Sequence, residues 1–386
     1  MRRLSVLFCM IILLISISSC RVAADHILEE RFRTEDLLPE YDMQLEYAVS
    51  KGSLCQYNGV YYYKPMMDAI YYYDRMSGTS GKLCAKADCT HNTRDCNAYL
   101  SSATGIQIYD GTLYFVENSV SLYSMDLSGN NRLPVMTLRN LQGTNPKFVI
   151  HRGYVYTSVS NDQIQAGEQK TRFTLCQQVL GNSDPAEPII DETFDGMAVE
   201  AWILRGNHLY AALDAVQSTG NLNKLYDYNI QTGELSCLWN EKSDYGVLDL
   251  RVKDSDTGLE MIQKKLDGQI RKIEFDFKTN DIKENLTYPK EAAITFVNFA
   301  GNGAIGYRSG KGILPYRIFN EKGKVNAEGT FPGPSGSSIY TIMTGCGSDE
   351  EGVYIAMHNT DVGEERLLHI SYESSGVDTL ISCSRD

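Results

Sequence analysis

The feature that most constrains the fold is an internal repeat of about 50 residues. Its clearest copy runs from Asp110 to Gly129 and contains two short apolar runs, Leu113 to Val116 and Val120 to Met125. Each run is too short for a helix and has the length and composition of a strand. In the closing turn, Asp126 to Gly129, the aspartate can bond to the following backbone and the glycine can supply positive φ. That turn is therefore a register mark for the repeat.

Seven copies align on this mark. The equivalent positions follow one another at intervals of 44 to 52 residues and are occupied by Asp74, Asp126, Gln178, Asn229, Asp276, Asn320 and Tyr372. An upstream apolar run recurs in each copy, beginning at or near Gly59, Gly111, Gly153, Gly206, Gly258, Gly303 and Gly352. Repeats of this size with about four strand-like runs are typical of a β-propeller, whose radial blades bury both faces against their neighbours. We therefore predict an all-β fold, a β-propeller of four-stranded antiparallel blades with seven blades.

The first twenty residues have the pattern of an export signal. Arg2 and Arg3 precede an apolar core, Leu4 to Ile17, that is too short and wrongly flanked to span a bilayer stably. The segment ends in Ile17-Ser-Ser-Cys20, which is similar to the bacterial lipobox, in which the cysteine becomes the diacylated N-terminus of the mature protein. We predict a lipoprotein signal peptide at 1–20, with diacylglycerol and palmitate carried by Cys20.

The alternative is an ordinary secretory signal cut after Val22-Ala-Ala24. Residues 21–40 carry mixed charge and few large apolar side chains, as expected for a flexible tether. The repeats occupy the remainder, so we predict a single β-propeller domain at 41–386. Leu45 to Ser50 is a candidate for a strand that closes the ring by pairing with the last blade. The expected location is the extracellular face of the cell membrane, with the protein exported and lipid-anchored.

The charge balance excludes one class of partner. The chain has 36 basic against 49 acidic residues, a formal net charge of -13, which makes nucleic acid or an anionic membrane surface an unlikely partner. Tyrosine is abundant, with 25 residues, and forms triplets at Tyr61 to Tyr63 and Tyr71 to Tyr73. These rings are expected to pack between blades. A stacking platform for sugar rings is the alternative, and it requires exposed rings.

One constellation has distinct chemical character. Cys84, Cys89, His91 and Cys96 lie within thirteen residues and match the ligand types of a closed tetrahedral Cys3His zinc site. The rival interpretation is a disulfide, because an exported protein meets oxidising conditions. Three cysteines cannot all pair among themselves, so one would seek a distant partner or stay free. In both cases the expected role is to staple a loop, with one structural zinc in the metal form. Reduced, unligated thiols are the remaining alternative.

Other candidates are weaker. Asp191, Glu192 and Asp195 can be interpreted as a Ca²⁺ cluster or as a solvated loop. Cys346 and Cys383 can form a disulfide within the last blade. The remaining strand cysteines are expected to be buried small hydrophobes.

The combination of a lipobox, tyrosine-rich blades and a Cys-x4-Cys-x-His-x4-Cys loop ending in Cys96-Asn-Ala-Tyr99 resembles a known group of proteins. These are the uncharacterised propeller lipoproteins of anaerobic Gram-positive bacteria, whose blades are similar to the six-bladed YWTD propellers of lipoprotein receptors. The chain departs from the YWTD pattern because no blade has that tetrapeptide intact and seven units are present. The resemblance implies no activity.

No reaction motif occurs in a convincing context. The sequence therefore favours a non-enzymatic function, a binding or scaffold module for a peptide, glycan or envelope protein. An extracellular hydrolase or lyase acting on polysaccharide or peptide, through carboxylates at the central channel, is the alternative. Propellers host both classes, so the fold alone does not decide between them.

Overall fold

The computed structural model describes residues 52–384, except 67–68, 101–102, 119, 139–146, 166–167, 183, 218–219, 254–256, 290–293, 333–339 and 373–375. Within these residues the regular structure consists of strands, and no helix is long and apolar enough to cross a membrane. The predictions for Cys20, for the tether and for the closing strand Leu45 to Ser50 lie outside the described residues.

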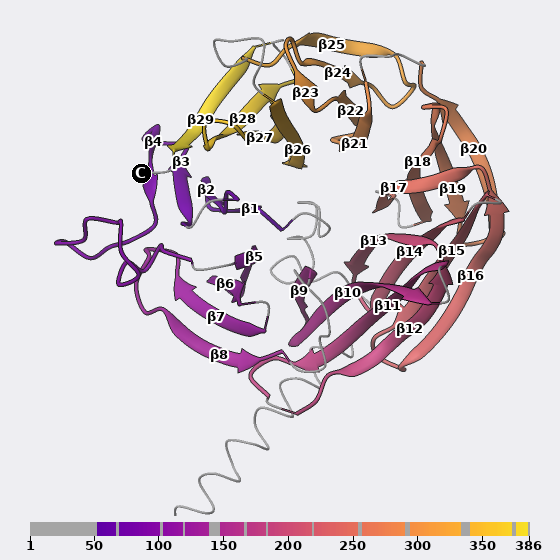
Figure 1. Ribbon diagram of the computed structural model, residues 1–386, viewed down its shortest axis with the longest axis horizontal. Helices are drawn as coiled ribbons and strands as arrows, with labels where there is room; N and C mark the ends of the chain where they lie inside the picture. The colour runs from indigo at the N-terminus through magenta and orange to yellow at the C-terminus, as the bar shows by residue number, and fades with distance from the viewer. Residues whose placement is uncertain are drawn as a thin grey trace, which may run out of the picture.

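Seven antiparallel sheets are arranged in a ring, with the first strand of each near the centre and the last at the rim (Figure 1). Blade one consists of β1 (Leu54–Tyr57), β2 (Val60–Tyr63), β3 (Tyr71–Asp74) and β4 (Thr79–Lys82). Blade two consists of β5 (Ala103–Tyr109), β6 (Thr112–Glu117), β7 (Ser121–Asp126) and β8 (Leu133–Thr137). Blade three consists of β9 (Lys147–His151), β10 (Tyr154–Gln165), β11 (Glu168–Val179) and β12 (Glu187–Asp195). Blade four consists of β13 (Met197–Arg205), β14 (His208–Gln217), β15 (Gly220–Asn229) and β16 (Glu234–Ser243).

Blade five is β17 (Tyr245–Val252), β18 (Gly258–Lys265), β19 (Ile270–Asp276) and β20 (Asp281–Thr287). Blade six is β21 (Phe296–Ala300), β22 (Gly303–Tyr307), β24 (Pro315–Phe319) and β25 (Val325–Thr330), and blade seven is β26 (Tyr340–Ser348), β27 (Gly352–Asn359), β28 (Glu364–Ser371) and β29 (Val377–Ser384). A two-residue strand from blade six, β23 (Gly310–Lys311), pairs with β26 and gives the last sheet a fifth strand. The predicted seven-bladed propeller is thus confirmed, with this one addition.

The register mark is also confirmed. Every marked position lies within one residue of the end of the third main strand of its blade, at the turn into the fourth. The side-chain mechanism holds in most copies: Asp276 Oδ1, for example, accepts the backbone N–H groups of Lys278 and Thr279 at 2.8 and 3.1 Å. In the third copy Gln178 replaces the short acid, and its Nε2 donates to the carbonyls of Asn182 and Asp184 in the turn.

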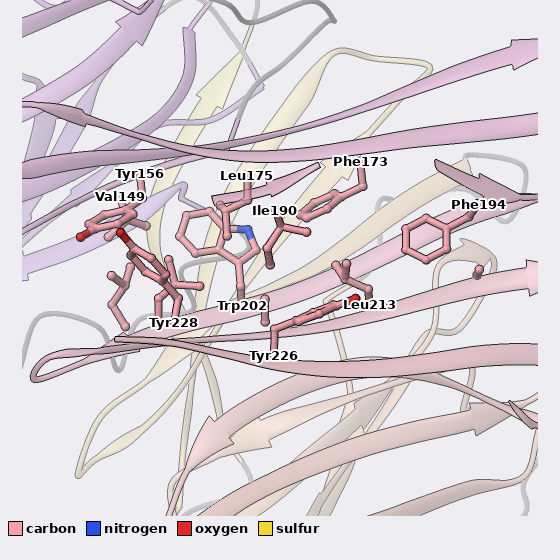
Figure 2. Packing of buried hydrophobic residues seen from close by; sticks show 14 residues of the cluster. Val149, Tyr156, Phe173, Leu175, Ile190, Phe194, Trp202, Leu213, Tyr226 and Tyr228 are labelled. Carbon is pink, nitrogen blue, oxygen red and sulfur yellow. The ribbon is translucent and has the colours of Figure 1, made fainter. Parts of the chain in front are cut away.

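Blade size varies round the ring. The strands of blade one have four residues each, whereas β10 and β11 have twelve each and form one long hairpin. The stretch from Ser160 to Arg172 is mostly paired strand within this hairpin. The large core between blades three and four contains Trp202, which lies beside Leu175 and Ile190 (Figure 2). Its indole N–H donates to Ser158 Oγ at 3.0 Å.

The ring closes by side-chain packing between blades one and seven. In the described part of the chain, both sheets are built from their own consecutive stretches of sequence, apart from β23. Tyr61 and Tyr63 pack with Tyr354, Leu367 and Ile381 in one apolar cluster. The first tyrosine triplet is fully buried, which agrees with the packing interpretation and not with an exposed sugar platform.

Candidate metal centre

The loop that follows β4 brings the four predicted ligand residues together. The Sγ atoms of Cys84, Cys89 and Cys96 and a ring nitrogen of His91 all lie within 4.8 Å of one another. Cys96 Sγ is 3.5 Å from His91 Nδ1. Each of the three cysteines is a free thiol, so the loop contains no disulfide. This donor set and spacing can hold a metal ion such as zinc.

Local backbone geometry explains why the donors converge. Cys89 N–H donates to the carbonyl of Lys86 at 3.2 Å, and Cys96 N–H donates to that of Thr93 at 3.0 Å, so tight turns precede both sulfurs. His91 has φ of 61°, in the left-handed region that few non-glycine residues adopt. A backbone held in this conformation turns the chain sharply between the second and third cysteines, which brings both ends of the loop to one point.

The surroundings shift the pKa values of two of the thiols in opposite directions. Burial raises the pKa of the Cys84 thiol, but hydrogen bonds from the backbone N–H groups of Lys86 and Asn97 lower that pKa to about 6 overall. Burial dominates at Cys96 and raises its pKa to about 11, against a hydrogen bond from the backbone N–H of Ala98. N–H groups directed at sulfur orient ligands and stabilise their charged form.

Two lysine side chains donate hydrogen bonds to backbone carbonyl groups of the loop. Lys82 Nζ donates to the His91 carbonyl at 3.1 Å, and Lys86 Nζ donates to that of Asp95. Three thiolates and one neutral imidazole around a dication carry one net negative charge. The two ammonium groups are therefore of the right sign to stabilise a loaded site.

The loop is also part of the seam between blades one and two. In Figure 1 it projects outward between β4 and the β7–β8 turn. Cys96, Ala98 and Leu100 are buried in the apolar cluster that joins the two blades. Asn97 Nδ2 donates to the Gly129 carbonyl at 2.8 Å. The site is thus placed to fasten one blade to the next.

A close backbone approach completes this contact. Gly129 has φ of 82°, and a Cβ atom there would lie 2.8 Å from the carbonyl oxygen of Leu83. Arg132 then reaches back from blade two, donating to the carbonyl of Tyr99 and pairing with Glu117.

The other sequence-based candidates do not assemble. Asp191 pairs with Arg172 at 2.6 Å, Glu192 with Lys224 at 2.6 Å, and Asp195 with Lys170 at 3.4 Å. These acids therefore form neither a Ca²⁺ cluster nor a solvated loop, because they lie in strand β12 and each carboxylate pairs with its own cation. Cys346 and Cys383 are both buried and are not joined to each other by a disulfide, so the structure does not support that possibility.

Sequence reasoning missed two groups. Tyrosine–carboxylate hydrogen bonds join blades one and seven, and a charged pocket lies between blades five and six. Both join residues from distant parts of the sequence. The only local signal was the presence of tyrosine in the first repeat.

Comparisons with known proteins agree with the architecture. No family model matches the chain, and no curated protein matches its sequence. Among solved structures, a prolyl endopeptidase is similar with a TM-score of 0.54 and 15% identity, over 92% of this chain and 51% of that one. Prolyl oligopeptidase B from Galerina marginata has a TM-score of 0.53 and 10% identity, over 95% and 54%. The chain thus spans about half the length of these peptidases, and the likeness shows the fold alone.

Proposed function

We propose that this protein is an exported lipoprotein whose propeller is a binding or scaffold module, held at the extracellular face of the membrane through Cys20. The proposal rests on the type of site that the clustered ligand side chains can form. Among the described residues, only Cys84, Cys89, His91 and Cys96 form a group of three or more potential ligands. Their number and type suit a structural site, since four protein ligands leave no open position for water activation.

The buried carboxylates support the same conclusion. Four are less than a tenth exposed in the described chain, and they come from four different blades. Three have partners of opposite charge or hydroxyl donors: Glu117 with Arg132, Glu260 with Lys272, and Glu365 with Tyr63. Paired acids of this kind stabilise a fold and do not form a catalytic pair.

The metal is part of this proposal. One Zn²⁺ bound by the three thiolates and the imidazole would add a cross-link to a loop whose turns are held by hydrogen bonds. Protein purified anaerobically without chelator is expected to contain about one zinc per chain. Acid treatment should release it and expose three alkylatable thiols. A metal-free protein with a mapped Cys–Cys crosslink inside the loop would refute the site.

Membrane attachment is tested separately. Cys20→Ala should abolish incorporation of labelled palmitate and release the protein from the membrane fraction. Cys9→Ala changes a cysteine within the apolar part of the leader and should leave labelling intact. Equal labelling of the Cys20→Ala protein would contradict the anchor. A pull-down from native cell envelopes with wild-type protein then identifies the bound partner.

One observation favours the alternative, a hydrolase or lyase acting on polysaccharide or peptide. Burial raises the pKa of the Asp214 carboxyl to about 7, and its Oδ1 has no hydrogen-bond partner. Acids with raised pKa values occur at catalytic sites. Asp214 is 2% exposed, however, which leaves no path to a polymer substrate. Loss of a measured hydrolytic activity on Asp214→Asn substitution would establish the alternative.

A further inference from the structure

We propose that a pocket between blades five and six binds a small organic anion bearing a carboxylate or phosphate group. The inference deepens the binding function proposed above and rests on it. The pocket has a volume of about 440 Å³, within the range of small-molecule sites. Its lining comes from strands β17 to β20 of blade five and from two turns of blade six that carry Asn302 and Lys322.

The first argument is charge. Four cations, Arg251, Lys253, Lys272 and Lys322, line the pocket against two carboxylates. Including Glu274, which pairs with Lys253 from outside the lining, the cations still exceed the carboxylates. The chain as a whole has 49 acidic and 36 basic residues, so the net charge of the pocket lining is opposite in sign to that of the whole chain. A local positive site on an acidic protein attracts anions selectively.

The second argument is a buried ion triad in the lining. Glu260 accepts from Arg251, with Nη2 at 2.6 Å, and from Lys272 Nζ at 2.7 Å. Burial tends to raise the pKa of Glu260, but the two cations hold it below its usual value. The triad therefore keeps one net positive charge, and Arg251 is fixed further by stacking 4.2 Å over the Phe299 ring.

The third argument is unused donor capacity. Lys272 is 7% exposed, and among the described residues its ammonium donates to Glu260. An ammonium has three N–H donors, and a buried one needs acceptors for the rest. Because Lys272 lines the pocket, a ligand oxygen there can accept a hydrogen bond from its ammonium group. Asn302 and Lys322, at the outer part of the lining, supply further donors for an anion's remaining oxygens.

Lys322 and Lys324 form a matched pair for the test. Both lie in the turn after β24 and are exposed, and their N–H groups donate to Asn320 Oδ1 at 3.0 and 3.1 Å. Only Lys322 lines the pocket. Replacement by glutamine removes the same charge from the same turn, so any difference in binding reports the pocket and not net charge.

The experiment is calorimetric titration of the full-length protein in detergent with glucuronate, glucose 6-phosphate and glucose. At least one of the two anions should bind, and the neutral sugar should not; which anion binds identifies the carboxylate or the phosphate as the recognised group. Lys322→Gln is expected to weaken binding about threefold to tenfold and Lys272→Met to abolish it, while Lys324→Gln leaves it unchanged.

Thermal unfolding of each variant separates loss of a ligand contact from loss of fold. Equal binding of glucose and the anions, no binding of either anion at millimolar concentration, or equal effects of the Lys322 and Lys324 substitutions would overturn the proposal. Since the probes are small and soluble, these outcomes are independent of membrane anchoring and of any protein partner. Failure to capture an envelope partner, with anion binding intact, would instead count against the scaffold function alone.

Discussion

Blade one is joined to its two neighbours in different ways. On the side of blade two, the Cys84 to Cys96 loop folds over an apolar seam and presents a metal-binding donor set. On the side of blade seven, tyrosine hydroxyls donate across the seam to the buried carboxylate of Glu365 and the partly buried one of Asp349. The strands of blade one have only four residues each, so its sheet is much smaller than those of blades three and four. Hydrogen bonds link this short blade to blade seven. The loop's donor set would link it to blade two in the proposed metal-bound form, so we call that side the ligated seam.

The seam with blade seven has two hydrogen-bond centres. Tyr63 hydroxyl donates to Glu365 Oε1, and the backbone N–H of Met66 donates to Glu365 Oε2 at 2.9 Å. At the second centre, Tyr61 hydroxyl donates to Asp349 Oδ2 at 2.7 Å. Burial raises the pKa of Tyr63 well above its usual value, so this hydroxyl stays a donor at all ordinary pH. The hydrogen-bonded seam is expected to depend on its two carboxylate acceptors, and the ligated seam on the proposed metal.

The largest effect is expected from breaking the ligated seam. Cys96→Ser removes a buried ligand and should lower the free energy of unfolding by about 4 kcal/mol, with hydrogen exchange rising first in blades one and two. A chelator should destabilise the wild type in the same way and have no further effect on the variant. Cys237→Ser, at an exposed free cysteine, is the control. Equal urea midpoints for the two variants would contradict a role for the loop.

Removing the main carboxylate of the seam with blade seven should have the next largest effect. Glu365→Ala leaves the Tyr63 hydroxyl and the Met66 N–H without their acceptor, which should cost about 3 kcal/mol in urea unfolding. The matched control is Glu364→Ala, at a neighbouring residue that is partly exposed and pairs with Arg366 at 2.6 Å. This substitution should lower the free energy of unfolding by less than about 1 kcal/mol. If both substitutions cost the same, the seam is not held by Glu365.

A single hydroxyl sharpens the comparison. Tyr354 hydroxyl lies 2.6 Å from Asp349 Oδ2 and 2.7 Å from the Tyr61 hydroxyl. Tyr354→Phe keeps the ring packing and removes these contacts, for an expected loss of about 1 to 2 kcal/mol. Tyr340→Phe, at an exposed tyrosine on β26, should be neutral. An unchanged thermal midpoint for Tyr354→Phe would show that the hydroxyl is satisfied equally well by water.

The smallest effect is a pH dependence of the same centre. Burial tends to raise the pKa of Asp349, but hydrogen bonds from Tyr354 and Tyr61 and from two backbone N–H groups hold it below its usual value. A carboxyl with a depressed folded pKa contributes stability that is present above the unfolded pKa, near 4, and is lost as pH falls through the folded value.

The stability difference between wild type and Asp349→Asn is therefore expected to shrink by less than about 1 kcal/mol as pH falls from about 6 to 3. Titration of the unfolding midpoint measures it. A difference that stays constant, or grows in acid, would show that the carboxylate charge does not matter at this seam.

The sequence by itself determined the architecture and the loop that carries the candidate metal ligands. Turn residues such as Asp74 and Asp276 accept hydrogen bonds from their own nearby backbone, and apolar runs report strand length locally, so a repeat marks every blade. The Cys84 to Cys96 loop was visible for the same reason, because all four donors lie within one short stretch. Even Gln178, which is not a typical turn residue, was located by the spacing of the other copies.

Only the tertiary structure decided which side chains meet between blades. Tyr63 and Glu365 are 302 positions apart, and Tyr61 and Asp349 are 288 apart, so no local pattern links them. The pocket of Arg251, Glu260 and Lys322 likewise combines strands of one blade with a turn of the next. Ring closure fixes these neighbours, because the rotation from blade to blade sets which faces touch. Residue types limit what each face can bond to, and the geometry of the closed ring selects the partner.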